Sequence, residues 1–397
     1  MYLLDQKAED LLSKITFAEQ TINELKLPDP VLASYIKPLQ IWTASLRNRV
    51  EQAKAEFTLF AQSSNFSQSE PLQESHQRRL LAAILRDFED IERRIRIGLD
   101  TFLPLIPIWN NQKDSKETKQ HHELLMHFVN DVMQLSHIDG QIMTIIGESY
   151  ACLPIEWVQT RKHVIFGTYS EIKNLHKSVL LAHEIGHVFY HKNDYEISSN
   201  VTPQVLRKLS QNRPPNIDQN NFDYALYVWA RHWIPEFVAD CFAVKTLGPA
   251  FVLQFMLIAL DSQPNRVEPT HPPSNLRIKF MVDILQTLNL SDIKVNNYQN
   301  LWDSYAHTVS TPNSLFIVDD EVVTTALDCI NSTVTLTPIE DKWAEILEAR
   351  KALEKGTVPN QDLVSIISAL AMEENRVDST LINKELLERH SSNSNVS

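Results

Sequence analysis

The sequence predicts an α+β protein that is mainly helical, and three observations support this fold class. Only 7 of the 397 residues are glycine, which is typical of long helices joined by few tight turns. Apolar residues recur at helical spacing through most of the chain. Two short β-rich runs, at 153–159 and 163–169, flank a polar segment at 160–162, so a small sheet is expected among the helices.

Residues 1–104 are predicted to form a helical domain. Apolar residues recur at helical spacing on either side of a polar break at 63–75. They are Ile15, Ala18, Ile22 and Leu25 before the break, and Leu80, Ile84, Phe88, Ile91 and Ile95 after it. A linker is expected at 105–120, where a polar run follows Pro107.

Residues 121–290 are predicted to form a second domain that holds both β-rich runs. A helix at 121–136 precedes these runs, and an apolar helix at 175–192 follows them. A polar insertion at 192–221, rich in Asn, Gln and Pro, comes next. It is expected to be a lid, a specificity loop or a disordered excursion.

The chain after residue 290 is again predicted to be helical. Residues 291–390 form a C-terminal helical region, with its clearest segments at 343–355 and 362–375. The last residues, 391–397, are expected to be disordered.

Composition excludes several classes of partner. The formal net charge of −13 disfavours binding to nucleic acid and to anionic membrane surfaces. The longest apolar run, 251–260, is too short to span a bilayer and contains Gln254, so it is expected to be a buried core helix. Three scattered cysteines, and an acidic start without a signal-peptide pattern, favour a cytoplasmic location.

The most informative motif is His183-Glu184-Ile185-Gly186-His187. Residues four apart on a helix share one face, about 6 Å from each other, so His183 and His187 can bind one metal ion. Glu184 then lies beside the open side of the metal, where it can act as general base toward a zinc-activated water. The flanking apolar residues predict a buried helix, in which two imidazoles need a partner such as a metal. Glycine is costly inside a helix, so Gly186 indicates a close approach to the backbone there.

A catalytic zinc needs a third protein ligand, and Glu236 is the candidate. It follows Pro235 at the start of an apolar helix, and Asp240 lies four residues further along the same face. Carboxylates that point into a core are costly unless they bind a metal or accept hydrogen bonds. We therefore predict that Glu236 completes a site for one Zn²⁺ per chain, and that Asp240 accepts a hydrogen bond that orients His183. The alternative is that both carboxylates form an exposed acidic edge near the helix start.

Taken together, these motifs resemble those of the gluzincin zinc metallopeptidases. The Glu-x-x-Ala-Asp pattern at 236–240 is similar to the second ligand helix of that family, and His-Pro-Pro at 271–273 followed by Arg277 is similar to a signature of its heat-shock and CAAX-prenyl branch. The resemblance covers about residues 160–285. It implies a zincin-like core of helices and a small mixed sheet, flanked by helical regions. It also implies an enzyme that hydrolyses peptide bonds of a protein or peptide substrate. Members of that branch commonly carry membrane-spanning helices, but this sequence has no apolar run long enough for one, so a soluble member is expected.

The resemblance assigns further roles near the metal. It implies that His271 stabilises the developing oxyanion, and that Arg277 either holds His271 or binds a carboxylate of the substrate. Tyr190 and Tyr227 are alternatives for the oxyanion role, and His271 could instead cap a helix.

The resemblance also implies that a strand at the edge of the sheet binds the substrate in extended form. The residues assigned to this edge strand are Val164, Phe166, Gly167 and Thr168. Gly167 marks either a close approach of the substrate or a β-bulge.

Two other functions stay open. The His-Glu-Ile-Gly-His sequence at 183–187 also resembles the ImmA/IrrE type of protease, which cleaves a repressor. A non-catalytic protein that contains zinc and regulates a partner is the second alternative, although a structural zinc site has no use for a base at Glu184. In either case the helical flanks are expected to offer a surface to a regulatory protein partner.

Overall fold

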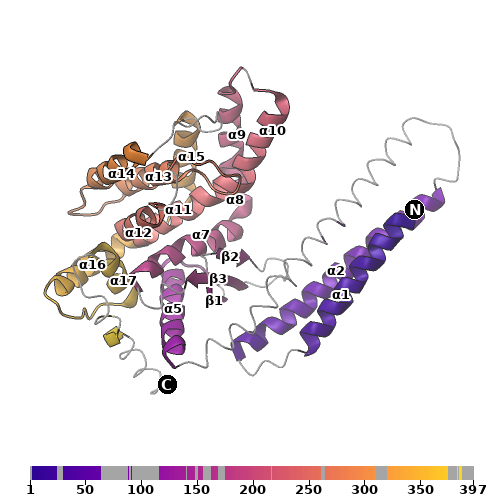
Figure 1. Ribbon diagram of the computed structural model, residues 1–397, viewed down its shortest axis with the longest axis horizontal. Coiled ribbons are helices and arrows are strands. Elements are labelled where there is room, and N and C mark those ends of the chain that lie inside the picture. The colour runs from indigo at the N-terminus through magenta and orange to yellow at the C-terminus, as the bar shows by residue number, and fades with distance from the viewer. Residues whose placement is uncertain are drawn as a thin grey trace. The chain divides into compact units, whose positions relative to one another are not determined.

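The protein is described by a computed structural model that consists of two compact units (Figure 1). Unit 1 comprises Met1–Lys113 and Ile155–Arg161, and unit 2 comprises Asp114–Pro154 and Lys162–Ser397. The structure describes residues 2–24, 30–63, 88, 91, 116–139, 141–147, 151–154, 162–168, 175–215, 217–260, 264–309, 320–373, 382 and 384–386. All residues of the predicted metal site belong to unit 2.

The described part of unit 1 contains two long antiparallel helices. They are α1 (Tyr2–Glu24) and α2 (Pro30–Ser63). Arg47 pairs with Glu19 at 2.6 Å and Lys54 pairs with Glu9. The later residue of α2 thus pairs with the earlier residue of α1, so the helices run in opposite directions. Their buried apolar residues are Ala8, Leu11, Ile15, Ala18 and Ile22 of α1 and Trp42, Leu46, Val50 and Ala53 of α2.

The apolar pattern predicted for residues 1–104 can be followed only in part. Ile15, Ala18 and Ile22 are buried at helical spacing, and Phe88 and Ile91 are buried as well. Four predicted positions lie outside the described residues, namely Leu25, Leu80, Ile84 and Ile95. Most of the predicted linker, 105–115, is also outside them, and residues 116–120 already belong to a helix of unit 2.

Unit 2 is built around two crossing helices, α7 (Leu181–Lys192) and α11 (Ile234–Leu247). The other helices are α5 (Lys116–Leu135), the 3-10 helix η3 (Leu175–Leu180), α8 (Asp194–Asn200), α9 (Thr202–Gln211), α10 (Gln219–Val228), the π-helix η4 (Trp229–Trp233), α12 (Pro249–Ala259), α13 (Ser274–Thr287), α14 (Val295–Val309), α15 (Asp320–Thr333), α16 (Pro338–Glu354) and α17 (Leu363–Glu373). One apolar core, formed by residues between Leu124 and Leu386, joins them.

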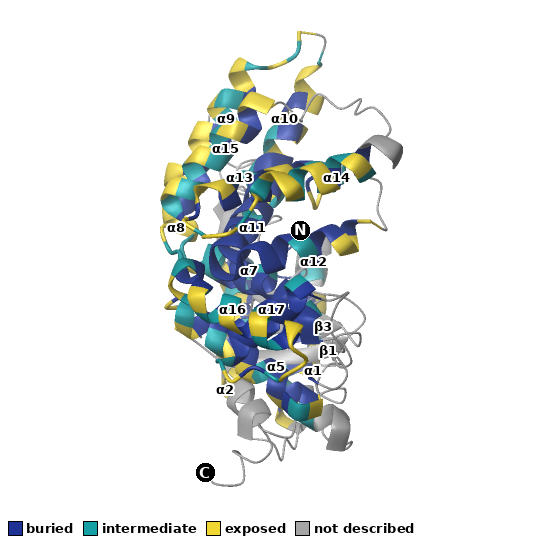
Figure 2. Cartoon of the chain, turned by 90° about the vertical axis from the view of Figure 1, so that its left-hand side faces the viewer, coloured by how far each residue is buried: buried dark blue, intermediate teal, exposed yellow. Residues whose placement is uncertain are grey.

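Helix α11 is buried along its whole length. Every residue except Pro235 is buried, and the dark blue of α11 and α7 in Figure 2 shows this. An apolar surface on all sides of a helix is typical of such a position. Pro235 fits the first turn, where its missing N–H is not needed, and the helix ends at Gly248, whose φ of 58° is unfavourable for other residues.

The two central helices cross closely because Gly186 has no side chain. A Cβ atom at Gly186 would lie 2.6 Å from Cα and 2.7 Å from the carbonyl oxygen of Ala239. Real Cβ atoms do not approach other atoms so closely, so only glycine fits at this crossing. The close approach that the sequence indicates at Gly186 is therefore that of the second helix, and it brings the His183 face of α7 against the beginning of α11.

The predicted polar insertion at 192–221 is mostly helical. It forms α8, α9 and the start of α10, where the side chain of Asp218 accepts a hydrogen bond from the Asn221 backbone N–H at 2.9 Å. Its buried apolar residues are Ile197, Val201, Val205 and Leu209. Helix α9 packs against α15, so this segment is part of the helical body and not a disordered excursion.

The C-terminal helices belong to the same unit as the predicted site. Helices α15 and α16 pack against α11, while α17 packs against α12 and η3. Lys245 of α11 donates hydrogen bonds to the carbonyl oxygens of Asn331, at 2.9 Å, and Val334, and so satisfies the end of α15. Residues 291–390 are thus no separate flank, and the predicted tail at 391–397 lies outside the described residues.

Three short strands lie next to α5 and α7. They are β1 (Gln141–Gly147), β2 (Ala151–Pro154) and β3 (Lys162–Thr168), in the order β1-β3-β2. Strand β3 pairs in parallel with β1 and antiparallel with β2, so it is the central strand.

The predicted edge strand is therefore wrong. Val164 and Phe166 have partners on both sides, which leaves no free backbone groups to which a substrate could add, while Gly167 and Thr168 pair with β1. The register with β1 continues through Gly167, so this residue forms no bulge on that side.

The α+β fold class is also wrong, because the protein is helical. Among the residues whose side chains the structure describes, none is in a strand. The described apolar core is made by helices packed on helices.

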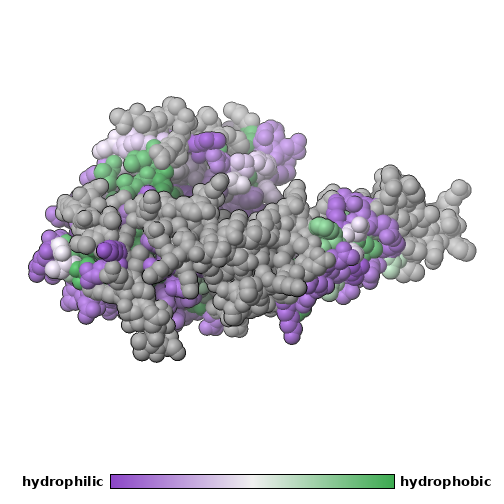
Figure 3. All heavy atoms as spheres, turned by 60° about the horizontal axis from the view of Figure 1, so that its bottom comes forward, coloured by the Kyte–Doolittle hydropathy of each residue, from purple (hydrophilic) through white to green (hydrophobic). Residues whose placement is uncertain are grey.

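The described residues visible in Figure 3 are mixed in character. Figure 3 shows hydrophilic side chains in purple, with smaller apolar areas in green between them. Three exposed apolar side chains gather at the end of α12, namely Leu257, Ile258 and Leu260. Within the described residues, no helix is both long enough and apolar enough to cross a membrane.

We expect the substitution Gly186→Ala to destabilise the protein. The new methyl group must push α7 away from Ala239, and overpacking of this kind costs about 1–3 kcal/mol, which exceeds the gain of about 1 kcal/mol in helix propensity. Urea unfolding should show a lower free energy of unfolding, and Gly186→Ser should lower it further. A free energy of unfolding that is unchanged or raised by Gly186→Ala would contradict the close crossing.

Candidate metal centre

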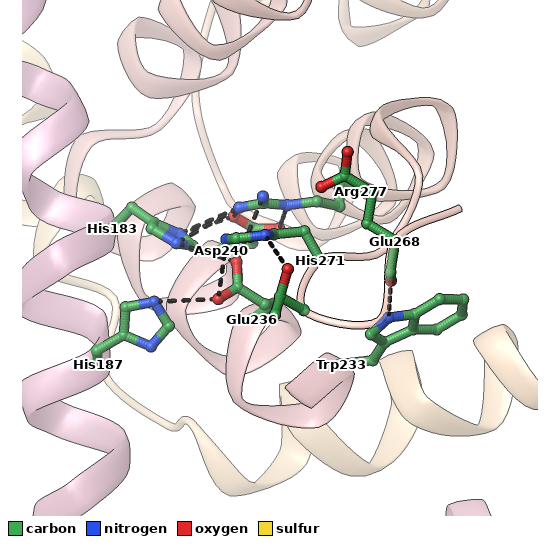
Figure 4. A network of polar contacts seen from close by, with 9 residues as sticks. His183, His187, Trp233, Glu236, Asp240, Glu268, His271 and Arg277 are labelled. Carbon is green, nitrogen blue, oxygen red and sulfur yellow. Dashed lines mark hydrogen bonds and ion pairs between the residues drawn. The ribbon is translucent and has the colours of Figure 1, made fainter. Parts of the chain in front are cut away.

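Three side chains that can bind a metal ion converge between α7 and α11 (Figure 4). His183 and His187 are four residues apart on α7 and face Glu236 in the first turn of α11. The Nε2 atoms of His183 and His187 lie 3.3 Å from Oε2 and 3.3 Å from Oε1 of Glu236, respectively. One donor atom of each residue lies within 4.8 Å of the others, so a single ion between them can contact all three.

These donors are enclosed by the core. The side chains of His183, His187 and Glu236 are 12%, 18% and 9% exposed, which rules out the exposed acidic edge considered for Glu236. The ring of Phe251 lies nearly parallel to that of His183, at 4°. Oε2 of Glu236 is buried, and Nε2 of His183 and Nη1 of Arg277 each lie 3.3 Å from it. Positively charged groups thus surround this carboxylate, as a buried charge requires.

Asp240 and Arg277 hold His183 from the other side. Nδ1 of His183 lies 2.9 Å from Oδ1 of Asp240, so the hydrogen on Nδ1 points to Asp240 and Nε2 points to the metal position. Arg277, in the first turn of α13, donates two hydrogen bonds to Asp240, from Nε and from Nη2, each of 2.7 Å. The guanidinium also lies 4.5 Å from the ring centre of Phe255. A two-point contact of this kind fixes both partners in one orientation.

The charged groups shift the pKa values of one another. Burial opposes protonation of His183, but its hydrogen bonds with Asp240 and Glu236 prevail and raise its pKa to about 10. Burial likewise opposes ionisation of Glu236, yet His183 and His187 hold the pKa of this carboxyl well below its usual value. The pKa of Asp240 is also lowered despite burial, because Arg277 and His183 stabilise the carboxylate. A cation that binds at this position therefore displaces a proton from His183.

Glu184 and His271 adjoin this network. Glu184 is buried next to His183 on α7, and its negative charge is among those that raise the pKa of Arg277 despite the burial of the guanidinium. His271 lies in the loop before α13, and its side chain is 55% exposed. Its Nε2 atom is 3.9 Å from Oε1 of Glu236, and its Nδ1 atom is 3.0 Å from the hydroxyl of Thr270. His271 thus stands at the exposed edge of the site.

Arg277 contacts the two carboxylates of α11. Asp240 takes two of its hydrogen bonds, and Glu236 lies 3.3 Å from Nη1. Its side chain is only 8% exposed. A sequence motif shows that an arginine follows His271 but not which carboxylate it meets, since that depends on how α13 packs against α11.

Two aromatic residues of the site were not predicted. Trp233, the last residue of the π-helix η4, donates a hydrogen bond of 3.1 Å to the carbonyl oxygen of Glu268 and so ties the loop of His271 to the start of α11. Phe255 of α12 covers Arg277. In the sequence, the position of Trp233 just before Pro235 and Glu236 was the available signal. In the structure Trp233 ends a π-helical turn, and such turns are frequent at functional sites.

The donors fit a zinc ion. Two imidazoles and one carboxylate make a set of three protein ligands, which is typical of catalytic zinc sites with an open fourth position. Cys241 follows Asp240 but is not part of the group, and burial raises the pKa of its thiol to about 12. His183, His187 and Glu236 would therefore hold the ion without sulfur.

The pKa of His183 predicts how the stability of the metal-free protein depends on pH. Its folded pKa of about 10 exceeds the unfolded value of about 6.5, so protonation of His183 stabilises the fold fully below pH ~6.5, and this contribution is lost as the pH rises toward 10. Urea unfolding of chelator-treated protein should show a lower free energy of unfolding at pH ~9.5 than at pH ~7. The loss should be smaller in His183→Gln, which cannot titrate. The same pH dependence in both proteins would contradict this account of the network.

Comparison with protein-family models, with curated proteins and with solved structures found no match for this chain. The resemblance to gluzincins therefore rests on the motifs at 183–187, 236–240 and 271–277 and on the geometry around them.

Proposed function

We propose that this protein is a zinc-dependent peptidase that hydrolyses peptide bonds in a protein or peptide substrate. The observation that carries this proposal is the convergence of His183, His187 and Glu236, with the buried Glu184 adjacent to His183 on α7. A purely structural site for zinc usually has four protein ligands, whereas this group offers three. When bound, zinc supplies a Lewis acid that polarises the peptide carbonyl and makes water more acidic.

Asp240 and Arg277 orient and stabilise the groups that would bind the metal. Asp240 keeps the Nδ1 hydrogen of His183 in place, so the lone pair of Nε2 stays directed at the metal position. Arg277 neutralises the charge of Asp240 and lies close to Glu236, which keeps both carboxylates ionised inside the core.

Glu184 is assigned the proton transfer. Its carboxylate accepts a proton from the attacking water and returns it to the nitrogen of the leaving amine, which needs no covalent intermediate with the protein. His271, exposed at the edge of the site, is placed to donate a hydrogen bond to the substrate carbonyl oxygen as negative charge develops.

The test compares metal content and cleavage in four purified full-length proteins. The wild type should contain about one zinc ion per chain and should cleave denatured casein or a mixture of peptides in a chelator-sensitive manner. Glu184→Gln should keep the zinc and lose cleavage by at least about 100-fold, because amide and carboxylate have the same shape but only the carboxylate is a base. Glu236→Ala should lose most of the zinc.

Glu196→Gln is the matched control, since Glu196 is exposed on α8, and this variant should behave as the wild type does. Cleavage that survives in Glu184→Gln would refute the mechanism. Full retention of zinc in Glu236→Ala would remove that residue from the metal site.

A further inference from the structure

The segment between α12 and α13 brings His271 to the metal centre. The structure describes its residues 264–273, hereafter the 264–273 loop, which form turns and bends. Near the end of this loop, Nε2 of His271 lies 3.9 Å from Oε1 of Glu236. The side chain of His271 is more than half exposed, and its Nδ1 atom contacts the hydroxyl of Thr270 in the same loop. The position of His271 therefore depends on where the backbone of the loop lies.

The two ends of the loop are joined to each other. The backbone N–H of Asn275 donates a hydrogen bond of 2.9 Å to the carbonyl oxygen of Pro264, and the side-chain amide of Asn275 donates one of 3.2 Å to Oδ1 of Asn265. Trp302 of α14 donates a hydrogen bond of 2.9 Å to Oδ1 of Asn275. These bonds fix the base of the loop, but they do not determine where its middle lies against α11.

Trp233 holds the middle of the loop at the start of α11 (Figure 4). Its indole N–H donates a hydrogen bond of 3.1 Å to the carbonyl oxygen of Glu268. Trp233 is fully buried, and its ring centre lies 5.1 Å from that of Trp229, so the indole is held in place by packing. A buried indole N–H normally has a partner, and a loop that lifts from α11 removes this one. The bond therefore favours the observed position of the loop.

The spacing of two contacts shows how this bond bears on His271. Trp233 and Glu236 are three residues apart, about one helical turn, and Glu268 and His271 are also three residues apart. The bond between Trp233 and Glu268 therefore places His271 beside Glu236. Val267 packs against the apolar core, but such contacts are not directional and allow the loop to slide. A hydrogen bond is directional, so it fixes the loop along the helix.

We infer that Trp233 is a positioning residue, which sets the place of His271 relative to the metal position through the backbone of the 264–273 loop. The inference rests on the proposed function, in which His271 donates a hydrogen bond to the carbonyl oxygen of the substrate. A hydrogen bond weakens when its donor moves away or out of line, and a misplacement of about 1 Å can slow a reaction about 100-fold. The loop must therefore be held.

Limited digestion of the full-length protein with trypsin tests the attachment of the loop without any need for activity. Arg266 is an exposed cleavage site in the loop, but Val267 packs against the core, so the cut between them requires local opening. Lys279 of α13 is exposed and precedes the buried Phe280, so a cut after it reports opening of the helical body. The ratio of the two rates, followed by mass spectrometry, isolates the loop from general destabilisation.

Two tryptophans give matched variants for this digestion. Trp233→Phe keeps an aromatic ring but removes the indole N–H, and the ratio of the Arg266 cut to the Lys279 cut should rise about 5-fold, as expected for the loss of one hydrogen bond. Trp343→Phe is the control, because Trp343 of α16 is also buried and donates a hydrogen bond of 2.9 Å to a carbonyl oxygen, that of Ser291. This control should leave the ratio unchanged.

A double-mutant cycle tests whether Trp233 acts through His271. On the peptide that the zinc-loaded wild type cleaves fastest, His271→Ala should lower kcat/KM about 100-fold, and Trp233→Phe should lower it about 10-fold. The double variant should be no slower than His271→Ala, because the position of the loop no longer matters once the donor is gone. Trp343→Phe should cleave as the wild type does.

An unchanged digestion ratio in Trp233→Phe, or the same rise in both tryptophan variants, would overturn the inference, because other contacts would then hold the loop. Additive losses in the double variant would also overturn it, since Trp233 would then act on another part of the site. A zinc-loaded wild type that cleaves no peptide would refute the proposed function and the catalytic role of the loop. The digestion would still decide whether Trp233 holds the loop.

Discussion

The close crossing of α7 and α11 is the constraint on which the site depends. At Gly186 the two backbones are so near that a Cβ atom would lie 2.6 Å from Ala239. On α7, His183 lies three residues before this contact and His187 directly after it. On α11, Glu236 lies three residues before Ala239 and Asp240 directly after it. Imidazole and carboxylate side chains are short. The donors of one helix can therefore meet those of the other only where the two backbones lie this close together.

The second requirement is electrostatic, since several ionisable groups lie inside an apolar core. Arg277 satisfies it by binding Asp240 with two hydrogen bonds and by lying 3.3 Å from Glu236. Removal of one member of a buried network leaves the others unpaired, which is more costly than the loss of a surface ion pair. The metal ion that we propose is the remaining member, and it would replace the proton on His183 and bind between the two imidazoles and Glu236.

Much of the site could be predicted from the sequence because its spacing is local. The positions of His183 and His187 on one helical face, and of Glu236 and Asp240 on another, follow from the geometry of a single helix, and the apolar neighbours show that both faces are buried. That the two helices meet was indicated only by Gly186. The partner of Arg277 could not be predicted, because it depends on the packing of α13 against α11.

The fold class was harder to predict than the site. The β-rich runs at 153–159 and 163–169 suggested an α+β fold with a small mixed sheet, but the described core consists of helices. The order of strands depends on pairing between distant segments, so sequence alone did not show that β3 is central. The polar composition of 192–221 likewise led to the prediction of a lid or loop in place of α8 and α9. The few apolar residues of these two helices are enough to bury one face of each.

X-ray absorption spectroscopy of the zinc-loaded protein at the zinc edge tests the central claim most directly. If His183, His187 and Glu236 hold the ion, the spectrum should show only nitrogen and oxygen at about 2.0–2.2 Å, with the outer-shell scattering of two imidazoles. Sulfur at about 2.3 Å, or a shell without imidazole, would contradict the account, because it would place the zinc away from the crossing of α7 and α11.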